Sequence, residues 1–407
     1  MGQYNSTIQW LYEQIPPYQL KGSGSYKPGL SRIKNFLKFL GNPQSNLKFI
    51  HVGGTNGKGS TSHMLSSILQ EFNKKVGLFT SPHMFDFRER IKINTNKIEK
   101  KIVVDFVAKN KDYFLSKKNS FFEISFAMAI FYFKLQKVDY AIIEVGLGGR
   151  LDATNVIQPL LSIITNIGYD HTKFLGDKIT SIANEKAGII KKNTPVLIGE
   201  KNQETDKVFI EKAKRESSKI FFAEDFLSSD IELRHNTNYQ KKNKTTAYAA
   251  IQILFENKIT TEIFKRGILN ISKNTSFRGR WEKVSNKPLT IADVAHNEEG
   301  FKEIIPEIRR IKSFRKIFVL GFVKDKPIEK IIKLFPKDGI YFFSTPKISR
   351  ALSLGHLDLI LKKTDINYQI FESIQEAYKR ALNEASNDDF IFIGGSNFTV
   401  AEVLTSN

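Results

Sequence analysis

KFIHVGGTNGKGS, residues 48–60, runs from an apolar segment into a glycine-rich turn and on into a segment of helical character. We predict a strand over Leu47–Val52 and a helix over Lys58–Phe72. Glycine lets backbone amides approach an anion closely, and the amides at the start of a helix bind phosphate. Lys58 is placed to neutralise charge on a transferred phosphate. The segment therefore predicts a loop that binds the phosphates of ATP.

The spacing of this loop differs from the common pattern G-x-x-x-x-G-K-[ST]. Val52 stands where the first glycine of that pattern would be, and the hydroxyl comes one place late, at Ser60. A glycine-rich turn with a solvated lysine is the alternative interpretation. The strand before the turn and the helix after it favour a phosphate loop, although such a loop does not identify the reaction.

Strand-like and helix-like segments alternate along most of the chain, which predicts an α/β fold with a largely parallel sheet. At 407 residues the chain is too long for one ordinary core, and its length alone indicates two or three domains. In the first part of the chain, further strands are predicted at Val76–Thr80, Tyr140–Val145, Ser162–Ile167 and Pro195–Ile198, and further helices at Phe121–Leu135 and Ile182–Ile190.

The stretch Asn270–Asn286 is polar and irregular, and we place a domain boundary in it. Beyond it the alternation restarts, with strands predicted at Leu289–Val294, Ile317–Leu320, Ile340–Phe343 and Phe390–Ile393, and helices at Phe301–Ile311, Ile328–Leu334 and Ile374–Ala385. We therefore predict a larger domain over residues 1–278 and a smaller, doubly wound domain over residues 279–407.

The composition excludes several classes of site. The chain has no cysteine, which rules out disulfides, zinc sites made of thiolates and cysteine nucleophiles. No apolar run is long enough to span a bilayer, and the N-terminus lacks the basic and apolar regions of a signal peptide. We expect a cytoplasmic protein with no membrane partner.

The formal net charge is +20, from 62 lysines and arginines against 42 aspartates and glutamates. Such a charge fits a nucleic acid, a membrane surface or an acidic small molecule as partner. The lysines are scattered along the chain, and no aromatic and basic motif of the RNA-binding kind is present. We favour compositional drift as the cause, with attraction of polyanionic substrates as a secondary benefit, and expect no nucleic-acid partner.

Three polar clusters lie at the ends of predicted strands, the usual place of ligands in α/β sheets. They are Thr80-Ser-Pro-His83, Glu144-Val-Gly-Leu-Gly-Gly-Arg-Leu-Asp152 and Asn166-Ile-Gly-Tyr-Asp-His171. The oxygen donors of Ser81 and Glu144 suit Mg²⁺, whereas His171 fits a ligand and a turn residue equally well. Glu144 could instead pair with a lysine, but the glycines behind it indicate close approach of the backbone to a ligand.

Two weaker signals lie elsewhere in the chain. Lys186 belongs to the helix-like segment Ile182–Gly188 and, taken alone, is expected to be a solvated lysine. The segment Asp293-Val-Ala-His-Asn297 comes at the end of a predicted strand, as a site would, but it is too short to be specific.

Together these segments resemble the folylpolyglutamate synthase and dihydrofolate synthase family of the Mur ligase superfamily. The resemblance extends over nearly the whole chain, from Tyr26-Lys-Pro-Gly-Leu30 to Gly395-Ser-Asn-Phe-Thr-Val-Ala-Glu402. Between those ends it includes His51–Ser60, Thr80–Asn94, Phe121–Glu123, Glu144–Asn155, Asn166–His171, Glu185–Ile189, Tyr239–Asn243, Gly279–Glu282 and Asp293–Asn297. It implies an N-terminal P-loop ATPase domain of the Mur ligase type and a smaller C-terminal Rossmann-like α/β domain, with the active site in the cleft between them.

The resemblance also implies the roles of individual residues. The nucleotide would be bound by Asn56, Gly57, Lys58, Gly59, Ser60, Asn243, Arg280, Asp293 and His296. Mg²⁺ would be bound by Ser81, Glu144 and His171, and Lys186 would be carbamylated, so that its added carboxylate supports a second metal. A pteroate site would lie near Phe121, Phe122, Glu123, Leu151, Asp152 and Ala153. Catalysis would depend on Lys58, His171 and Lys186.

Three residues depart from the pattern of this family. Arg278 stands where proline is usual, Val294 replaces a small residue, and Glu298 replaces a proline. All three belong to the nucleotide end of the pattern, so they put details of adenine binding in question and leave the phosphate chemistry untouched.

We therefore expect an ATP-dependent ligase that adds L-glutamate to a folate-type acid (dihydropteroate, a reduced folate or both) through an acyl phosphate. The resemblance implies ATP and two Mg²⁺ sites, allows for a monovalent cation, and suggests a monomer. The main alternative is another Mur-type ligase that acts on a peptidoglycan precursor, but Thr80–His83 and Phe121–Glu123 favour the folate branch. A basic P-loop ATPase that binds nucleic acid is a more distant alternative, which the lack of a clustered basic patch disfavours.

Overall fold

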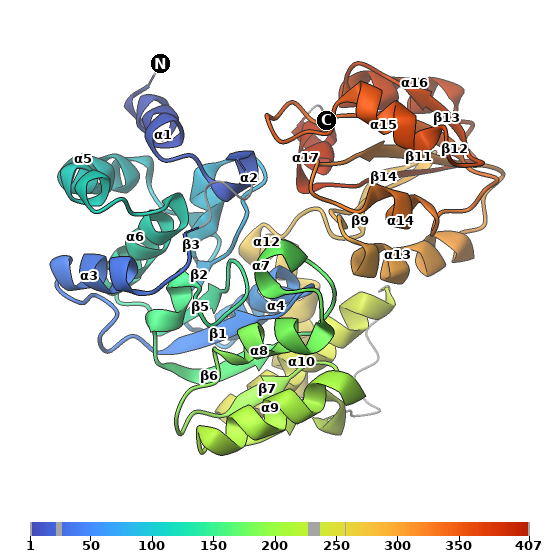
Figure 1. The fold of residues 1–407 in the computed structure, drawn as a ribbon. Helices are drawn as coiled ribbons and strands as arrows, with labels where there is room; N and C mark the ends of the chain where they lie inside the picture. The colour runs from blue at the N-terminus through green and yellow to red at the C-terminus, as the bar shows by residue number, and fades with distance from the viewer. Residues whose placement is uncertain (1, 22–26, 227–236, 257, 406–407) are drawn as a thin grey trace. The chain divides into compact units, whose positions relative to one another are not determined.

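The computed structural model describes residues 2–21, 27–226, 237–256 and 258–405. Tyr26, at one end of the family resemblance, lies outside the described residues. The chain divides into two compact units, each with its own sheet (Figure 1). The first unit comprises Met1–Tyr18, Ser23–Asn236 and Gln240–Phe277, and the second comprises Gln19–Gly22, Thr237–Tyr239 and Arg278–Asn407.

The sheet of the first unit has eight strands in the order β4-β3-β2-β5-β1-β6-β7-β8. The strands are β1 (Phe49–Gly53), β2 (Val76–Phe79), β3 (Ile91–Ile93), β4 (Asn96–Lys97), β5 (Tyr140–Glu144), β6 (Pro159–Ile164), β7 (Val196–Ile198) and β8 (Ile220–Phe222). The strands from β2 to β8 across the sheet pair in parallel, whereas β3 and β4 add an antiparallel edge. Since β1 lies between β5 and β6, the loops that follow these three strands meet at one edge of the sheet.

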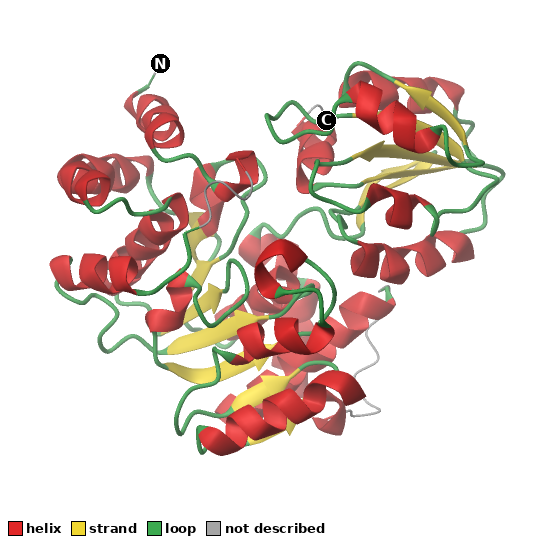
Figure 2. Ribbon diagram, viewed as in Figure 1, coloured by secondary structure: helices red, strands yellow, loops and turns green. Residues whose placement is uncertain are grey.

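Helices cover both faces of this sheet (Figure 2). In chain order the helices are α1 (Gln3–Gln14), α2 (Tyr18–Lys21), α3 (Ser31–Phe39), α4 (Lys58–Glu71), α5 (Lys100–Ser116), α6 (Phe121–Leu135), α7 (Thr172–Leu175), α8 (Ile179–Ala187), α9 (Gln203–Arg215), α10 (Asn238–Phe255), α11 (Thr261–Leu269) and α12 (Ile271–Thr275), with 3-10 turns η2 (Phe87–Arg90), η3 (Ala153–Val156) and η4 (Ala223–Phe226).

The central strands of the first unit are buried on both faces. Phe49 of β1 joins the core formed with α1, α3, α5 and α6, whereas its neighbour Ile50 joins the core formed with α4, α10 and α11, because successive side chains of a strand point to opposite faces. All residues of β1 are buried, as expected for a central parallel strand. The predicted α/β class with a parallel sheet is therefore confirmed.

The sheet of the second unit has six strands in the order β13-β12-β11-β14-β10-β9. The strands are β9 (Glu282–Asn286), β10 (Leu289–Ala292), β11 (Lys316–Gly321), β12 (Ile340–Ser344), β13 (Asn367–Ile370) and β14 (Phe390–Gly394), and the helices are α13 (Glu298–Arg310), α14 (Ile328–Ile332), α15 (Leu354–Leu361), α16 (Ile374–Glu384) and α17 (Asn397–Thr405). Only the edge strand β9 pairs antiparallel among these described strands. The predicted smaller, Rossmann-like unit is confirmed.

Two sequence-based predictions of local structure were wrong. Ser162–Ile167 was predicted as a strand, but β6 ends at Ile164, because its partner β1 ends at the paired residue Gly53 and turns there into the glycine-rich loop. Asn270–Asn286 was predicted to be irregular, but it contains α12 and β9. β9 is an edge strand with only partly buried and exposed residues, so it lacks the apolar run that marks a strand in a sequence.

The chain passes from the first unit to the second at Arg278, and two short earlier segments also belong to the second unit. We keep the division into residues 1–278 and 279–407 as a proposal for the two domains. Within the described ranges, every helix is too short or too polar to cross a membrane.

Candidate active site

The glycine-rich loop connects β1 to α4 at the edge where several loops meet. Gly54 and Gly57 adopt φ angles of +137° and +81°, which side chains rarely allow. A Cβ atom on Gly54 would lie 1.9 Å from Oγ1 of Thr165, and one on Gly57 would lie 2.2 Å from Oδ1 of Asn243. Both positions therefore require glycine, because the backbone approaches its neighbours more closely than any side chain permits.

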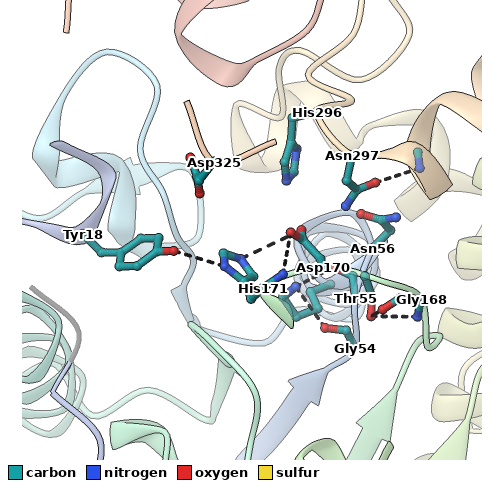
Figure 3. A network of polar contacts seen from close by, with 12 residues as sticks. Tyr18, Gly54, Thr55, Asn56, Gly168, Asp170, His171, His296, Asn297 and Asp325 are labelled. Carbon is teal, nitrogen blue, oxygen red and sulfur yellow. Dashed lines mark hydrogen bonds and ion pairs between the residues drawn. The ribbon is translucent and has the colours of Figure 1, made fainter. Parts of the chain in front are cut away.

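Hydrogen bonds from the turn after β6 hold this loop in place (Figure 3). The amides of Thr55 and Asn56 donate to the carbonyl and the side-chain oxygen of Asn166, both at 2.9 Å. The hydroxyl of Thr165 donates to the carbonyl of Asn56 at 2.6 Å, and the hydroxyl of Thr55 both donates to the carbonyl of Gly168 and accepts from its amide. The cluster Asn166–His171 was predicted to lie at a strand end, but its hydrogen bonds to the loop were not, because only the strand order brings the two turns together.

Two lysines converge on the same carbonyl of the loop. The Nζ of Lys58 donates to the carbonyls of Gly54 and Thr55 at 3.1 and 2.8 Å, and the Nζ of Lys186 donates to the carbonyl of Gly54 at 2.7 Å. Lys186 is only 4% exposed, so the expectation of a solvated lysine is wrong. Burial, followed by the nearby charge of Lys58, lowers the pKa of Lys186 to about 7, against opposing effects of Asp170 and Asp152. An anion bound at the loop would relieve this crowding of positive charge.

A carboxylate and a serine lie beside the first turn of α4. Glu144 ends β5 and is 4% exposed, and its Oε2 accepts a hydrogen bond from the amide of Ser81 at 2.9 Å. A Cβ on Gly59 would lie 3.6 Å from Oε1 of Glu144, an ordinary contact. The predicted magnesium ligands Ser81 and Glu144 are therefore brought together next to the phosphate loop. Their oxygen donors fit Mg²⁺, which proteins commonly bind with one or two carboxylates while nucleotide phosphates supply other ligands.

His171, the third predicted magnesium ligand, lies with Asp170 in the turn before α7. Its backbone has a φ of +51°, and its amide donates to Oδ1 of Asp170 at 2.8 Å. Its Nε2 lies 3.9 Å from Oδ2 of Asp170, and its Nδ1 lies 3.2 Å from the hydroxyl of Tyr18. Among the described residues, no three histidine, aspartate or glutamate side chains gather in a way that could bind a metal.

The predicted pteroate residues Phe121 and Phe122 begin α6. Phe121 is only 4% exposed, and its ring packs 5.6 Å from that of Tyr12 and 5.7 Å from that of Phe87. Phe122 is partly buried and lies against Gly146, where a Cβ would come within 2.5 Å of its ring. One of the glycines behind Glu144 is thus explained by the packing of Phe122.

Glu123, another predicted pteroate residue, is used by the protein itself. It is 1% exposed, its Oε2 accepts from the amide of Ser120 at 2.6 Å, and its amide donates to the hydroxyl of Ser120. Its carboxylate also pairs with Arg32 at 3.2 Å. This capping box at the start of α6 gives Glu123 a structural task, which sequence reasoning had not assigned.

Leu151 and Asp152 precede η3, and Ala153 is its first residue. Asp152 is 5% exposed, and its carboxylate accepts hydrogen bonds from the amides of Leu147 and Thr154 at 2.9 and 3.0 Å. Burial raises the pKa of Asp152, although these hydrogen bonds oppose the rise. Leu151 is partly buried and Ala153 is buried. The buried carboxylate of Asp152 therefore holds the turn after β5 through these hydrogen bonds.

The predicted nucleotide residues divide between the two units. Asn243 belongs to the first unit, where it lies against Gly57. Arg280, Asp293 and His296 belong to the second unit. The carboxylate of Asp293 accepts from the hydroxyl of Tyr239 and from the amide of Trp281, at 2.6 and 2.7 Å.

These second-unit groups are electrostatically connected. Burial raises the pKa of Asp293, and the guanidinium of Arg280 opposes the rise. The Nδ1 of His296 lies 3.1 Å from the carbonyl of Val294. A carbonyl can only accept, so Nδ1 must carry the proton of the neutral ring. The turn after β10 therefore contains Asp293 and His296, and the charge of Arg280, which precedes β9, acts on Asp293.

Comparison with known proteins places the chain among ligases. The family model for the Mur ligase middle domain matches residues 52–272, and that for the Mur ligase, glutamate ligase domain matches residues 279–397. The chain is 31% identical to the dihydrofolate synthase/folylpolyglutamate synthase of Bacillus subtilis strain 168 over an alignment of 437 positions with gaps, which covers 98% of each protein.

Solved structures agree with the match in sequence. The Escherichia coli FolC protein in complex with DHPP and ADP is similar with a TM-score of 0.85 and 27% identity, covering 98% of this chain and 97% of that one. The bifunctional folylpolyglutamate synthase/dihydrofolate synthase of Yersinia pestis, complexed with AMPPNP and Mn ion, has a TM-score of 0.84 and 26% identity, with the same coverage.

Gly54→Ala tests the close approach of the loop, with Gly59→Ala as the matched control. The new Cβ at residue 54 meets Thr165 at 1.9 Å in a backbone conformation unsuited to alanine, whereas at residue 59 it has ordinary contacts. We expect Gly54→Ala to destabilise the first unit by about 2 kcal/mol or more and Gly59→Ala to change its stability little. Thermal unfolding of both variants checks this, and equal melting temperatures would contradict it.

Proposed function

Because this chain belongs to the folylpolyglutamate synthase and dihydrofolate synthase family of Mur ligases, we propose that it extends both dihydropteroate and a reduced folate with L-glutamate. It is an ATP-dependent ligase that forms a carbon–nitrogen bond between glutamate and a folate-type carboxylate, and it uses a divalent metal. The relatives that match nearly its whole length are folate enzymes, which favours this substrate class over a peptidoglycan precursor.

One observation carries the assignment of the chemistry. The loop Gly54–Gly57 can exist only without side chains at its two strained positions, and Lys58 and Lys186 both direct their ammonium groups to it. This arrangement supports a phosphate site in which Asn56, the glycines and Ser60 bind through the backbone and the start of α4.

The first chemical step has to give the carboxylate a leaving group. We propose that a carboxylate oxygen of the folate-type acid attacks the γ-phosphorus of ATP, so that ADP leaves and an acyl phosphate forms. Negative charge spreads over the transferred phosphoryl group during this step. Lys58, whose ammonium group lies at the loop beside the carbonyls of Gly54 and Thr55, supplies positive charge that can stabilise the transferred phosphoryl group.

The second step makes the amide. The free amine of glutamate attacks the acyl carbon, the bond from that carbon to the phosphate oxygen breaks, and the amine gives up a proton to solvent. No side chain forms a covalent bond with the substrate in this sequence, so alignment and exclusion of water are the main tasks of the protein. We propose that Phe121, Phe122, Leu151, Asp152 and Ala153 shape the pteroate site, with Glu123 supporting it through its cap on α6.

We propose that Ser81, Glu144 and His171 are the divalent-metal ligands. When bound there, the cation offsets charge on the phosphates of ATP. Glu144 and Ser81 are held in contact next to α4, and the neighbouring carboxylate of Asp170 adds negative charge beside His171. Arg280, Asp293, His296 and Asn243 are proposed to bind the rest of the nucleotide.

Lys186 is proposed to be carbamylated. Its amine would attack CO₂, lose a proton and become a carbamate whose carboxylate supports a second metal, as the family resemblance implies. Burial of the amine and the adjacent charge of Lys58 both disfavour its ammonium form, which is the form that cannot react. A monovalent cation is an expectation from the resemblance alone.

We also propose a cytoplasmic monomer with no nucleic-acid partner. Support comes from the scattered lysines and the lack of cysteine in the sequence. Salt-sensitive binding of DNA or RNA with stimulated ATP turnover would argue for the nucleic-acid alternative instead.

The substrates are tested by assays with ATP, Mg²⁺ and glutamate, adding dihydropteroate or tetrahydrofolate in separate reactions and identifying products by mass. We expect ligation with both acids, and loss of at least ~100-fold in rate for Lys58→Ala, because its charge stabilises the transferred phosphoryl group. Product from one acid alone would restrict the activity to one step. Full activity of Lys58→Ala, or no ligation with either acid, would contradict the assignment.

Carbamylation of Lys186 is tested by incubating the protein with ¹³C-bicarbonate and recording its ¹³C spectrum. We expect a carbamate signal that disappears in Lys186→Ala and persists in Lys244→Ala, since Lys244 is a second buried lysine, 5% exposed, outside the phosphate loop. Persistence of the signal in Lys186→Ala would show that another amine carries it, and absence of the signal from the wild-type protein would remove this part of the proposal.

A further inference from the structure

A tyrosine from the start of the chain contacts His171. The hydroxyl of Tyr18, at the first position of α2, lies 3.2 Å from Nδ1 of His171, 153 residues further along the chain. The two rings also meet edge-on, with centroids 5.7 Å apart and planes at 64°. The ring of Tyr18 has a second such contact with Phe174, at 6.4 Å. The phenol is therefore held by ring packing as well as by its hydroxyl.

His171 is contacted from two directions. Figure 3 shows Tyr18 approaching the imidazole from one side and Asp170 from the other. Tyr18 contacts Nδ1, whereas the carboxylate of Asp170 lies 3.9 Å from Nε2. The backbone of His171 is fixed as well, because its amide donates to Asp170 and its carbonyl accepts from Phe174 at the start of α7. The ring of His171 is therefore oriented by its contacts with Tyr18 and Asp170.

A neutral imidazole carries one proton, and only the nitrogen without it can bind a metal. If Nδ1 holds the proton, it can donate to the oxygen of Tyr18, and Nε2 is then the nitrogen that faces the carboxylate side. If Tyr18 donated to Nδ1 instead, Nε2 would carry the proton and could not act as a ligand. The hydroxyl of Tyr18 can either accept a hydrogen bond from Nδ1 or donate one to it. Only when it accepts is Nε2 free of a proton and able to bind a metal.

We propose that Tyr18 is a positioning residue for the divalent-metal site. Its hydroxyl oxygen accepts a hydrogen bond from the Nδ1–H group of His171, so that Nε2 carries no proton and is presented to the cation. This inference rests on the proposed function of His171 as a ligand. Groups that orient a metal-bound histidine through its other nitrogen commonly affect metal affinity by ~10–100-fold. Tyr18 supplies such a group from a part of the chain that contains none of the residues assigned to the site.

The test measures metal affinity rather than turnover. Mn²⁺ is titrated into the protein with AMPPNP, and free Mn²⁺ is followed by electron paramagnetic resonance. Tyr18→Phe removes one hydroxyl and keeps the ring that packs on His171 and Phe174, so folding is expected to be preserved. We expect Tyr18→Phe to weaken Mn²⁺ binding ~10-fold and His171→Ala to weaken it at least as much.

Tyr169→Phe is the matched control. Tyr169 is 47% exposed in the same turn as His171, and its hydroxyl makes no hydrogen bond to any residue that the structure describes. We expect the Tyr169→Phe variant to bind Mn²⁺ with the same affinity as the wild-type protein. A loss of affinity in Tyr169→Phe as large as that in Tyr18→Phe would mean that any disturbance of this turn has the effect, and would overturn the specific role of Tyr18.

Comparing His171→Ala with Tyr18→Phe distinguishes the positioning role of Tyr18 from the ligand role of His171. If His171→Ala weakens Mn²⁺ binding and Tyr18→Phe does not, Tyr18 has no positioning role, and the proposed ligand role of His171 stands. If His171→Ala leaves Mn²⁺ binding unchanged, the ligand role fails, and the role of Tyr18 fails with it.

Discussion

The close approach of the Gly54–Gly57 backbone to Thr165 and Asn243 is the constraint on which the rest of the site depends. At both glycines a Cβ would overlap a side-chain oxygen, at 1.9 and 2.2 Å. This approach is what lets the turn after β6 form its hydrogen bonds to Thr55 and Asn56. The parallel order β5-β1-β6 makes it available, because the loops after neighbouring parallel strands leave the sheet at the same edge.

The charges at this edge are arranged for a polyanionic substrate. Lys58 and Lys186 share the carbonyl of Gly54, and Lys186 is buried, so its ammonium form is disfavoured. Glu144 and Asp170 place carboxylates in the two neighbouring turns. Lysines around the loop favour a nucleotide phosphate, and the nearby carboxylates favour a divalent cation, so the two kinds of charge together suit a nucleotide and a metal ion bound side by side.

The parts of the fold and of the site that depend on local sequence pattern could be predicted from the sequence. The strand–glycine turn–helix segment, the bounds of α6 and the buried strand before Glu144 all lie where periodicity and turn residues predicted them. The parts that it could not provide depend on contacts across the chain. Tyr18 lies 153 residues before His171, Thr165 meets a loop more than a hundred residues earlier, and Lys186 had been expected in solvent. Glu123 was assigned to substrate by resemblance, whereas its cap on α6 and its pair with Arg32 become apparent only in the fold.

The proposed reaction requires that the carboxylate is activated as an acyl phosphate before the amide forms. The most direct measurement follows oxygen, using dihydropteroate whose reacting carboxylate carries ¹⁸O in both positions, with ATP, Mg²⁺ and glutamate. If an acyl phosphate forms, the inorganic phosphate released with each ligation will contain one ¹⁸O atom, because a carboxylate oxygen bridges carbon and phosphorus in that intermediate and leaves with the phosphate. Ligation that releases phosphate with no ¹⁸O would contradict the acyl phosphate, whatever the identity of the residues that bind ATP.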